Sequence, residues 1–448
     1  MSQRGAVAVT RFGLGAQPGE INRASDDPEQ WLLSQLDTSR GIDFPDQALK
    51  SSKVQFSKAL DYFQARRSQD AEGNKQRAFR RDVRDATRAE VSARTVFAAS
   101  TEAPFHERLL RFWANHFTVA ANSPQTRVLV GAYEREAIRP HILGSFAELA
   151  ERAIFHPGML VYLSNWQSIG PNSVAGRRRD RGLNENLARE VLELHTVTPS
   201  SGYTQSDVTA FAKSLTGWTV GNRRIGADRK GETIYEDRLH EPGRRTLLGQ
   251  RYSDTGGSQS KSILRDLCRS PHTAQRIAFK LARHFVSDAP PTSLVEKLKA
   301  SFLETEGDLQ SLYRTLITAD EAWVSAANKY KTPDELIVST GRLIGLRRVL
   351  VGDAGKVFES FAQIPFTAPS PQGWPDEADA WNGPDMIMKR VEWANRLADQ
   401  NASMDGRALL QQGLGERASH ETLQAVARAE TPSQAIALAL LSPDFQMR

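Results

Sequence analysis

Cysteine is almost absent from this chain of 448 residues, and long apolar runs are missing as well. The lone cysteine, Cys268, has no partner for an internal disulfide and is too little for a thiolate-rich metal site. The longest uncharged apolar run, residues 435–441, is far shorter than the ~18 residues expected of a membrane span. Only a short apolar run precedes Thr10 and Arg11, so no signal-peptide core is visible. As written, the sequence predicts a cytoplasmic protein with no membrane span.

A strong charge of either sign is also missing. The 58 basic and 53 acidic residues leave a net charge of only +5, which is weak evidence for nucleic acid. A nucleic-acid partner is therefore not expected, and basic clusters such as Arg177 to Arg179 are its only support. The chain has no GxGxxG after a strand, no P-loop and no GxSxG. Nucleotide binding and serine-hydrolase chemistry consequently lack their usual phosphate cradle and nucleophile turn.

Helical signals, by contrast, recur along the chain. Residues 105–121 carry apolar side chains at helical spacing. Thr204 precedes Asp207 by three residues, and Thr332 precedes Glu335 in the same way. In this capping-box arrangement the two side chains satisfy backbone N–H groups at the start of a helix. We therefore expect helices to begin after Thr204 and after Thr332.

Strand and loop signals are confined to a few segments. Strand-like sequence occurs only near residues 233–252, so the predicted fold class is all-α, mainly helical, with at most one small β-hairpin there. Residues 170–183, which include Arg177 to Arg181, are expected to form an exposed loop. The proline-rich segment 365–384 is expected to be a second connection.

The segment from Gly182 to His195 carries the most suggestive chemistry. At 100° per residue, Asn186, Glu190 and Glu193 share one helix face beside an apolar stripe. Two carboxylates on one face bind a divalent cation, or shift each other's pKa for acid–base catalysis. His195 follows Glu193 by two residues, nearly on the opposite side, so it joins them only if the helix ends there. The structural alternative is that the glutamates form buried ion pairs with Arg189 or another arginine.

Other histidines and two tryptophans are candidates for the same site or for a binding surface. His116 and His240 are candidate metal ligands together with Glu190 and Glu193, and the alternative is that each histidine is a hydrogen-bonded core residue. A second group of residues is predicted to form a partner or substrate surface, because aromatic faces stack on sugars and prolines. This predicted surface consists of Trp374, Trp381, Asn115 and His156. Packing of an irregular loop onto the core is the alternative for the tryptophans.

Several blocks of sequence resemble one bacterial family, the proteins known as domain of unknown function 1800. The resemblance covers nearly the whole chain, and its most specific block runs from Asn184-Glu-Asn186 to Leu194-His195. The blocks are Arg11-Phe-Gly-Leu-Gly15, Phe112-Trp-Ala-Asn-His116, His156-Pro-Gly-Met-Leu160, Gly182 to His195, Gly202-Tyr-Thr-Gln205, Lys280-Leu-Ala-Arg-His284 and Ser370-Pro-Gln-Gly-Trp-Pro375.

This resemblance implies one large helical domain over residues 1–448 and no established activity. Many relatives are exported with a signal sequence, which makes a periplasmic or exported location the alternative to the cytoplasm. Many are also encoded beside a sulfatase-like or phosphatase-like protein, which is the partner that the resemblance implies. Two positions depart from the family pattern, because relatives often have histidine at Ala114 and aspartate at Ser164.

Two functional hypotheses follow from these residues. The first is a metal-assisted or acid–base hydrolase, with Glu190 and Glu193 as ligands or general base and with histidines as ligands or proton donors. Asn186 and Arg189 belong to this candidate catalytic site, and a divalent metal is its candidate cofactor. The second is a non-enzymatic accessory protein that binds a partner protein or a polysaccharide through the tryptophan-containing surface.

Overall fold

The computed structural model describes residues 2–37, 44, 49–67, 73–178, 182–324, 329–350 and 354–448. These residues are mainly helical, which confirms the predicted fold class. The helices of the first half are α1 (Gln3–Val7), α2 (Glu20–Ser25), α3 (Pro28–Leu33), α4 (Ser52–Arg67), α5 (Gly73–Ser100), α6 (Pro104–His116), α7 (Pro124–Arg127), α8 (Val130–Tyr133), α9 (Phe146–Ile154), α10 (Pro157–Tyr162), α11 (Asn186–Glu190) and α12 (Gln205–Leu215).

The second half continues with helices after a short stretch of strands. Those helices are α13 (Gly257–Arg269), α14 (Pro271–Phe285), α15 (Thr292–Glu304), α16 (Leu309–Thr318), α17 (Pro333–Ile344), α18 (Leu346–Val349), α19 (Ala354–Ser360), α20 (Pro384–Gln400), α21 (Gly406–Leu414), α22 (His420–Ala427), α23 (Pro432–Leu441) and α24 (Pro443–Gln446). Both capping boxes are present, because α12 begins after Thr204 and α17 begins after Thr332. No helix in the described ranges has the length and apolarity that crossing a membrane requires.

The strands form two small antiparallel sheets. Strand β3 (Arg245–Leu247) pairs with β4 (Gln250–Tyr252), and this is the hairpin expected from the sequence. Strand β1 (Trp218–Val220) pairs with β2 (Thr233–Tyr235), and this second sheet exceeds the one hairpin that was predicted. Its first strand has only three residues, too few for a period-two pattern to stand out.

The helices surround two main apolar cores. Helices α6, α9 and α12 to α16 contribute to the larger core, where Phe105 of α6 meets Phe285 of α14 with ring centroids 5.7 Å apart. Helices α17 to α23 bury a second core around Leu336 and Leu440. The prediction of a single domain over residues 1–448 stays a prediction.

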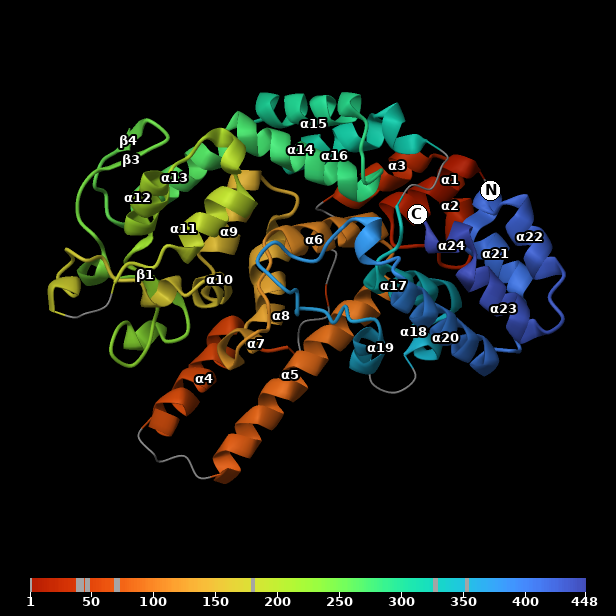
Figure 1. Ribbon diagram of the computed structural model, residues 1–448, viewed down its shortest axis with the longest axis horizontal. Coiled ribbons are helices and arrows are strands. Elements are labelled where there is room, and N and C mark those ends of the chain that lie inside the picture. The colour runs from red at the N-terminus through yellow and green to blue at the C-terminus, as the bar shows by residue number, and fades with distance from the viewer. Residues whose placement is uncertain are drawn as a thin grey trace.

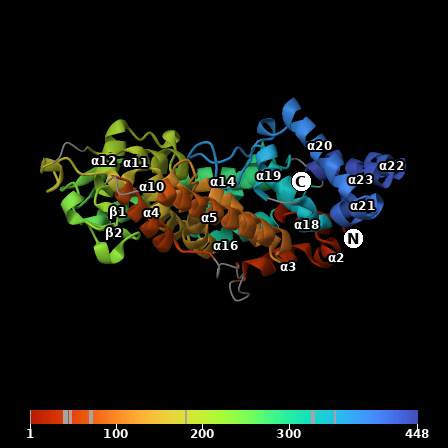
Figure 2. The same cartoon turned by 90° about the horizontal axis from the view of Figure 1, so that it is seen from below.

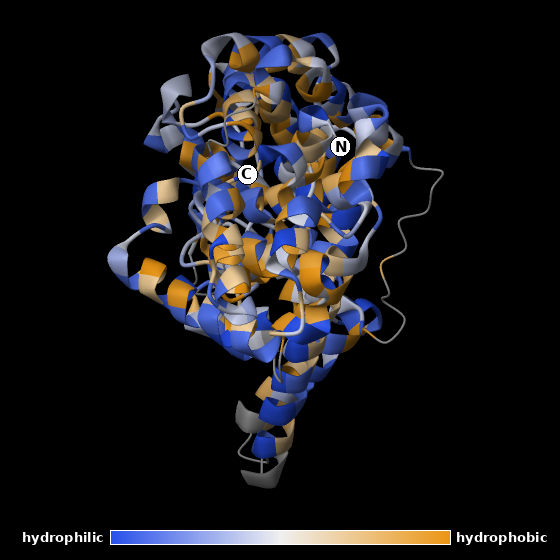
Figure 3. Cartoon of the chain, turned by 90° about the vertical axis from the view of Figure 1, so that its right-hand side faces the viewer, coloured by the Kyte–Doolittle hydropathy of each residue, from blue (hydrophilic) through white to orange (hydrophobic). Residues whose placement is uncertain are grey.

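The outline of the molecule is elongated. Figure 1 shows α11 to α13 and the strands at one end, and α20 to α23 at the other end near both termini. Figure 2 shows the same order from below. Helices α4 and α5 project from the body as an arm, and Figure 3 shows this arm as largely hydrophilic with scattered apolar residues.

Candidate functional site

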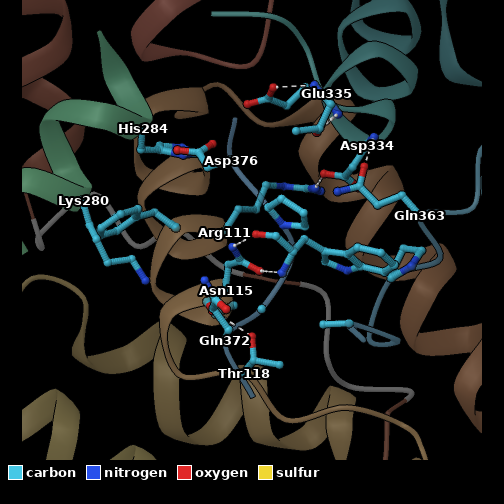
Figure 4. Close-up of a pocket in the computed structure, with 18 of the residues that line it drawn as sticks. Arg111, Asn115, Thr118, Lys280, His284, Asp334, Glu335, Gln363, Gln372 and Asp376 are labelled. Atoms are coloured by element: carbon cyan, nitrogen blue, oxygen red, sulfur yellow. Dashed lines mark hydrogen bonds and ion pairs between the residues drawn. The ribbon is translucent and has the colours of Figure 1, made fainter. Parts of the chain in front are cut away.

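A cavity of about 480 Å³ lies where α6, α14, the start of α17 and the segment 363–377 meet. Figure 4 shows the side chains that line it, which come from regions far apart in the sequence. The charged residues of its lining are Arg94, Arg108, Arg111, Arg276, Lys280, Arg283, Glu134, Asp334, Glu335, Asp376 and Glu377. A concave site with convergent charged groups is the usual form of a ligand-binding site.

Most of the cations in this lining are neutralised by carboxylates of the same lining. Such pairing is what buried charges require, because an unpaired charge loses its hydration without compensation. The ion pairs are Arg94 with Glu134 and Asp334, Arg108 with Glu335, Arg111 with Asp334, and Arg283 with Glu377.

Arg276 and Lys280 differ from these cations. They lie one turn apart on α14, and neither has a carboxylate within ion-pair distance among the side chains that the structure describes. The buried Nε of Arg276 has no hydrogen-bond partner there, which is also true of the Nε atoms of Arg111 and Arg283. Burial lowers the pKa of Arg276, and Glu193 partly opposes this shift from beyond ion-pair distance. The cavity therefore carries positive charge that no residue of the described lining neutralises.

The helical pattern of α14 explains why these two side chains share a face. Ile277 and Leu281 are fully buried in the larger core, each one position after a cation. Residues spaced by four lie on the same side of a helix, so Arg276 and Lys280 project together beside that apolar stripe.

Lys280 makes its hydrogen bond with a buried histidine. Its Nζ lies 3.1 Å from Nδ1 of His116, and the Nε2 of His116 lies 3.2 Å from the backbone oxygen of His195. Because a carbonyl oxygen only accepts, Nε2 carries the hydrogen, and Nδ1 accepts one from Lys280. Burial, followed by the Lys280 charge, holds the pKa of His116 well below its ordinary value. His116 is thus a neutral acceptor that fixes the position of the lysine amine.

The same environment lowers the pKa of Lys280 itself to about 7. Burial is the largest cause, and the charge of Arg276 adds to it. Asp376 and Glu377 act in the opposite direction, but these carboxylates are engaged with His284 and Arg283. At neutral pH a large fraction of Lys280 is therefore an uncharged amine.

His195 supports this arrangement through its backbone. Its imidazole is fully buried, with ring centroids 5.2 Å from Phe117 and 5.7 Å from His116. Burial lowers its pKa to about 3, and both ring nitrogens lack a hydrogen-bond partner in the described part of the chain. A π-helical turn, Val191–His195, ends the helix at this residue and leaves its carbonyl directed at His116.

The segment from Ser370 to Glu377 forms one wall of the cavity, and Asn115 holds it. The Asn115 side chain donates to the backbone oxygen of Trp374 at 2.9 Å and accepts from the Trp374 N–H at 2.7 Å. Gly373 has φ +90°, and a Cβ there would lie 2.5 Å from the Asn115 oxygens. Trp381 is buried and donates from Nε1 to Pro375 O at 3.0 Å. Three of the four residues of the predicted binding surface thus lie together.

Asn115→Ala should lower the free energy of unfolding by about 2 kcal/mol, because two hydrogen bonds to the Trp374 backbone are lost. Urea denaturation followed by circular dichroism measures this change. Gln372→Ala is the matched control, since this exposed residue of the same segment makes no side-chain hydrogen bond with a described residue. Equal stabilities of the two variants would contradict the role of Asn115.

The predicted carboxylate face lies outside the lining of this cavity. Asn186 is exposed, whereas Glu190 and Glu193 are half-buried and form no hydrogen bond or ion pair with any described residue. Burial raises the pKa of Glu190, and the charge of Glu193 adds to it. Arg189 pairs instead with Glu185 at 3.3 Å, so the ion-pair alternative with Arg189 is wrong.

The predicted metal ligands are not brought together. Within the described ranges, no group of three His, Cys, Asp or Glu side chains is arranged to hold a metal ion. His116 bonds Lys280, while the Nδ1 of His240 bonds the backbone oxygen of Thr216 at 2.9 Å. The described residues therefore do not assemble the set His116, Glu190, Glu193 and His240: His116 uses both ring nitrogens in hydrogen bonds, and His240 bonds Thr216 through Nδ1. His156, predicted on the binding surface, caps α10 and bonds Glu136 at 3.1 Å.

Two residues of the cavity were not singled out from the sequence. Arg276 and Lys280 are spaced by four on an amphipathic helix, and this pattern is common on solvated helix faces. The block Lys280-Leu-Ala-Arg-His284 was part of the family resemblance, but no role followed from it. The arginine-rich loop is described only in part: Arg177 is exposed, and residues 179–181 lie outside the described residues.

Comparisons with known proteins support the family resemblance that was seen in the sequence. Neither the curated proteins nor the solved structures include a match to this chain. One family model, described as a protein of unknown function (DUF1800), matches residues 7–447. The match includes α6, α14 and the segment 370–377, and therefore the residues that surround Lys280. Because it spans nearly the whole chain, the protein belongs to the DUF1800 family.

Proposed function

We propose that the protein binds a small anionic ligand in the cavity beside α14. The single observation that carries this proposal is the contrast between paired and unpaired cations. Four arginines of the lining have carboxylate partners, whereas Arg276 and Lys280 have none among the described residues. A carboxylate, phosphate or sulfate group of a ligand supplies the missing partner.

Arg276 is the main counter-charge of this ligand. Its guanidinium stays charged at neutral pH and offers donors in a planar fork that matches two oxygens of an oxyanion. Lys280 adds a donor at the same place, because the two side chains lie one helical turn apart. The charge of Glu193 attracts Arg276 only from beyond ion-pair distance, which leaves the guanidinium available.

The geometry of the cavity bears differently on the hydrolase hypothesis and on the accessory-protein hypothesis. The hydrolase hypothesis placed its acid–base chemistry on Glu190 and Glu193, which lie outside the cavity lining, whereas Lys280 lies within it. The accessory-protein hypothesis loses support, because Trp381 is buried and Trp374 is held against Asn115. A sulfatase-like or phosphatase-like partner rests on the family resemblance alone.

Arg276→Gln should weaken anion binding at least tenfold, because a charge-assisted hydrogen bond to an oxyanion contributes roughly 1.5 to 3 kcal/mol. Titration calorimetry with inorganic phosphate, sulfate and acetate at low ionic strength measures the affinity. The variant should keep its fold, since Arg276 has no ion pair among the described residues to lose.

Arg265→Gln is the matched control, because this arginine is exposed on the neighbouring helix α13. It should bind all three anions as the unaltered protein does. Absence of binding to the unaltered protein at millimolar concentrations would refute the anion site. Equal affinity of the Arg276 and Arg265 variants would refute the role of Arg276.

A further inference from the structure

Lys280 has the surroundings of a reactive amine. One of its hydrogens is donated to His116 Nδ1, a contact that orients the nitrogen. The amine points from α14 toward the side of the cavity that carries Asn115, as Figure 4 shows. Asp376 and Glu377, the acids of the lining whose charges act on Lys280, are bonded to His284 and Arg283. The nitrogen therefore faces open space in which a ligand carbon can lie.

We propose that Lys280 forms an imine with the carbonyl group of an anionic substrate, a 2-oxo or 3-oxo acid, whose acid group binds Arg276. This inference rests on the anion site proposed above. Side chains at positions i and i+4 of a helix start about 5 to 6 Å apart. A substrate that bridges them needs its carbonyl carbon close to its acid group, as 2-oxo and 3-oxo acids have.

Two further observations support a nucleophilic role. Burial and the Arg276 charge bring the pKa of Lys280 to about 7, so the amine form is available at neutral pH. A lysine that is desolvated or placed beside another cation is the usual activated amine of imine-forming enzymes. The cavity of about 480 Å³ is larger than such an acid needs, which leaves room for a substituent on the carbonyl.

The reaction balances without an oxidant or reductant. The lone pair of the Lys280 nitrogen forms a bond to the carbonyl carbon, and the carbonyl oxygen takes up a proton that the nitrogen releases. Loss of that hydroxyl as water breaks the C–O bond and forms the C=N bond, with the second nitrogen proton leaving in the water. His116 is a positioning residue in this step, because its depressed pKa prevents it from storing the proton.

Trapping with pyruvate and sodium cyanoborohydride tests the proposal on the full chain. Hydride from the reagent reduces the imine to a stable secondary amine, and peptide mass spectrometry locates it. We expect Lys280 to react at least tenfold faster than Lys58, an exposed lysine of α4 that serves as the internal reference. The rate at Lys280 should rise with pH through about 7.

Acetone, the neutral analogue of pyruvate, distinguishes imine formation at Lys280 from recognition of the acid group at Arg276. The ratio of Lys280 to Lys58 labelling should fall at least tenfold when acetone replaces pyruvate, and Arg276→Gln should remove that difference. Lys280→Arg should abolish the labelled peptide. Labelling of Lys280 no faster than Lys58 with either ketone would overturn the imine, even where phosphate binding to Arg276 stands. Fast labelling of Lys280 by both ketones alike would overturn the assignment of an anionic substrate.

Discussion

Lys280→Met should stabilise the folded protein at pH 7 by roughly 3 kcal/mol, although it removes the proposed reactive group. In the folded state burial and Arg276 lower the pKa of Lys280 to about 7 from an ordinary value of 10.5. Each unit of this difference corresponds to about 1.4 kcal/mol of destabilisation of the charged lysine. Methionine fills a similar volume without a charge to desolvate.

The stability gained by Lys280→Met should depend on pH, because the folded and unfolded states release the Lys280 proton at different pH values. Between about pH 7 and 10.5 the unfolded chain keeps a proton on Lys280 that the folded protein has released. Stability of the unaltered protein should therefore rise with pH across this window, by up to about 1.4 kcal/mol per unit. The methionine variant lacks this contribution but leaves His116 Nδ1 without its donor, which costs about 1 to 2 kcal/mol, so its advantage should be largest below pH 7 and vanish before pH 10.5.

Urea denaturation at pH 6, 7, 8 and 9 measures this difference. Lys213→Met is the control, because Lys213 is also a half-buried helical lysine but lies outside the cavity lining. It should change stability by the same amount at every pH. A loss of stability in the Lys280 variant, or a difference that does not shrink as pH rises, would show that Lys280 is a structural cation.

Much of the fold followed from local signals in the sequence. The capping boxes at Thr204 and Thr332 placed the starts of α12 and α17, because such boxes act within one helical turn. The β1–β2 sheet could not be predicted from local signals, since Trp218 and Tyr235 pair across a loop that has no alternating apolar pattern. A three-residue strand is stabilised by its partner and its packing, and neither is visible in a local window.

The site depended on contacts between distant parts of the chain. His116 and Lys280 are 164 positions apart, and Asn115 and Trp374 are 259 apart. The sequence indicated His116, His195, Asn115 and Trp374 as candidates, but their partners came only from the fold. Among the arginines of the cavity lining, Arg276 is distinguished by the absence of a described carboxylate partner, and pairing is a three-dimensional property.

Glu335→Gln should lower the free energy of unfolding by about 3 to 5 kcal/mol at pH 7, the largest loss expected at this site. Glu335 lies in the first turn of α17 and pairs with two buried arginines, Arg108 and Arg448, the second at 2.9 Å. Glutamine keeps the hydrogen bond that its side-chain oxygen accepts from the Thr332 N–H. The amide NH2 then stands where Oε1 accepts from Arg108, so the change removes both the charge and this acceptor and leaves both guanidinium groups uncompensated.

Lowering the pH should reduce the difference in free energy of unfolding between the unaltered protein and Glu335→Gln. Burial by itself would raise the pKa of Glu335, but Arg448 and Arg108 outweigh it and hold the pKa well below its ordinary value of 4.5. A carboxylate with a depressed pKa stabilises the folded state above its unfolded pKa, and this contribution is lost as pH falls toward the folded value. The gap in free energy of unfolding between the unaltered protein and Glu335→Gln should therefore be constant above about pH 5 and narrow steadily below about pH 4.

Glu392→Gln, an exposed site on α20, controls for the loss of one surface charge. A gap that stays the same from pH 7 to pH 3 would mean that shape and hydrogen bonding at Glu335, and not its charge, hold α17 against α6.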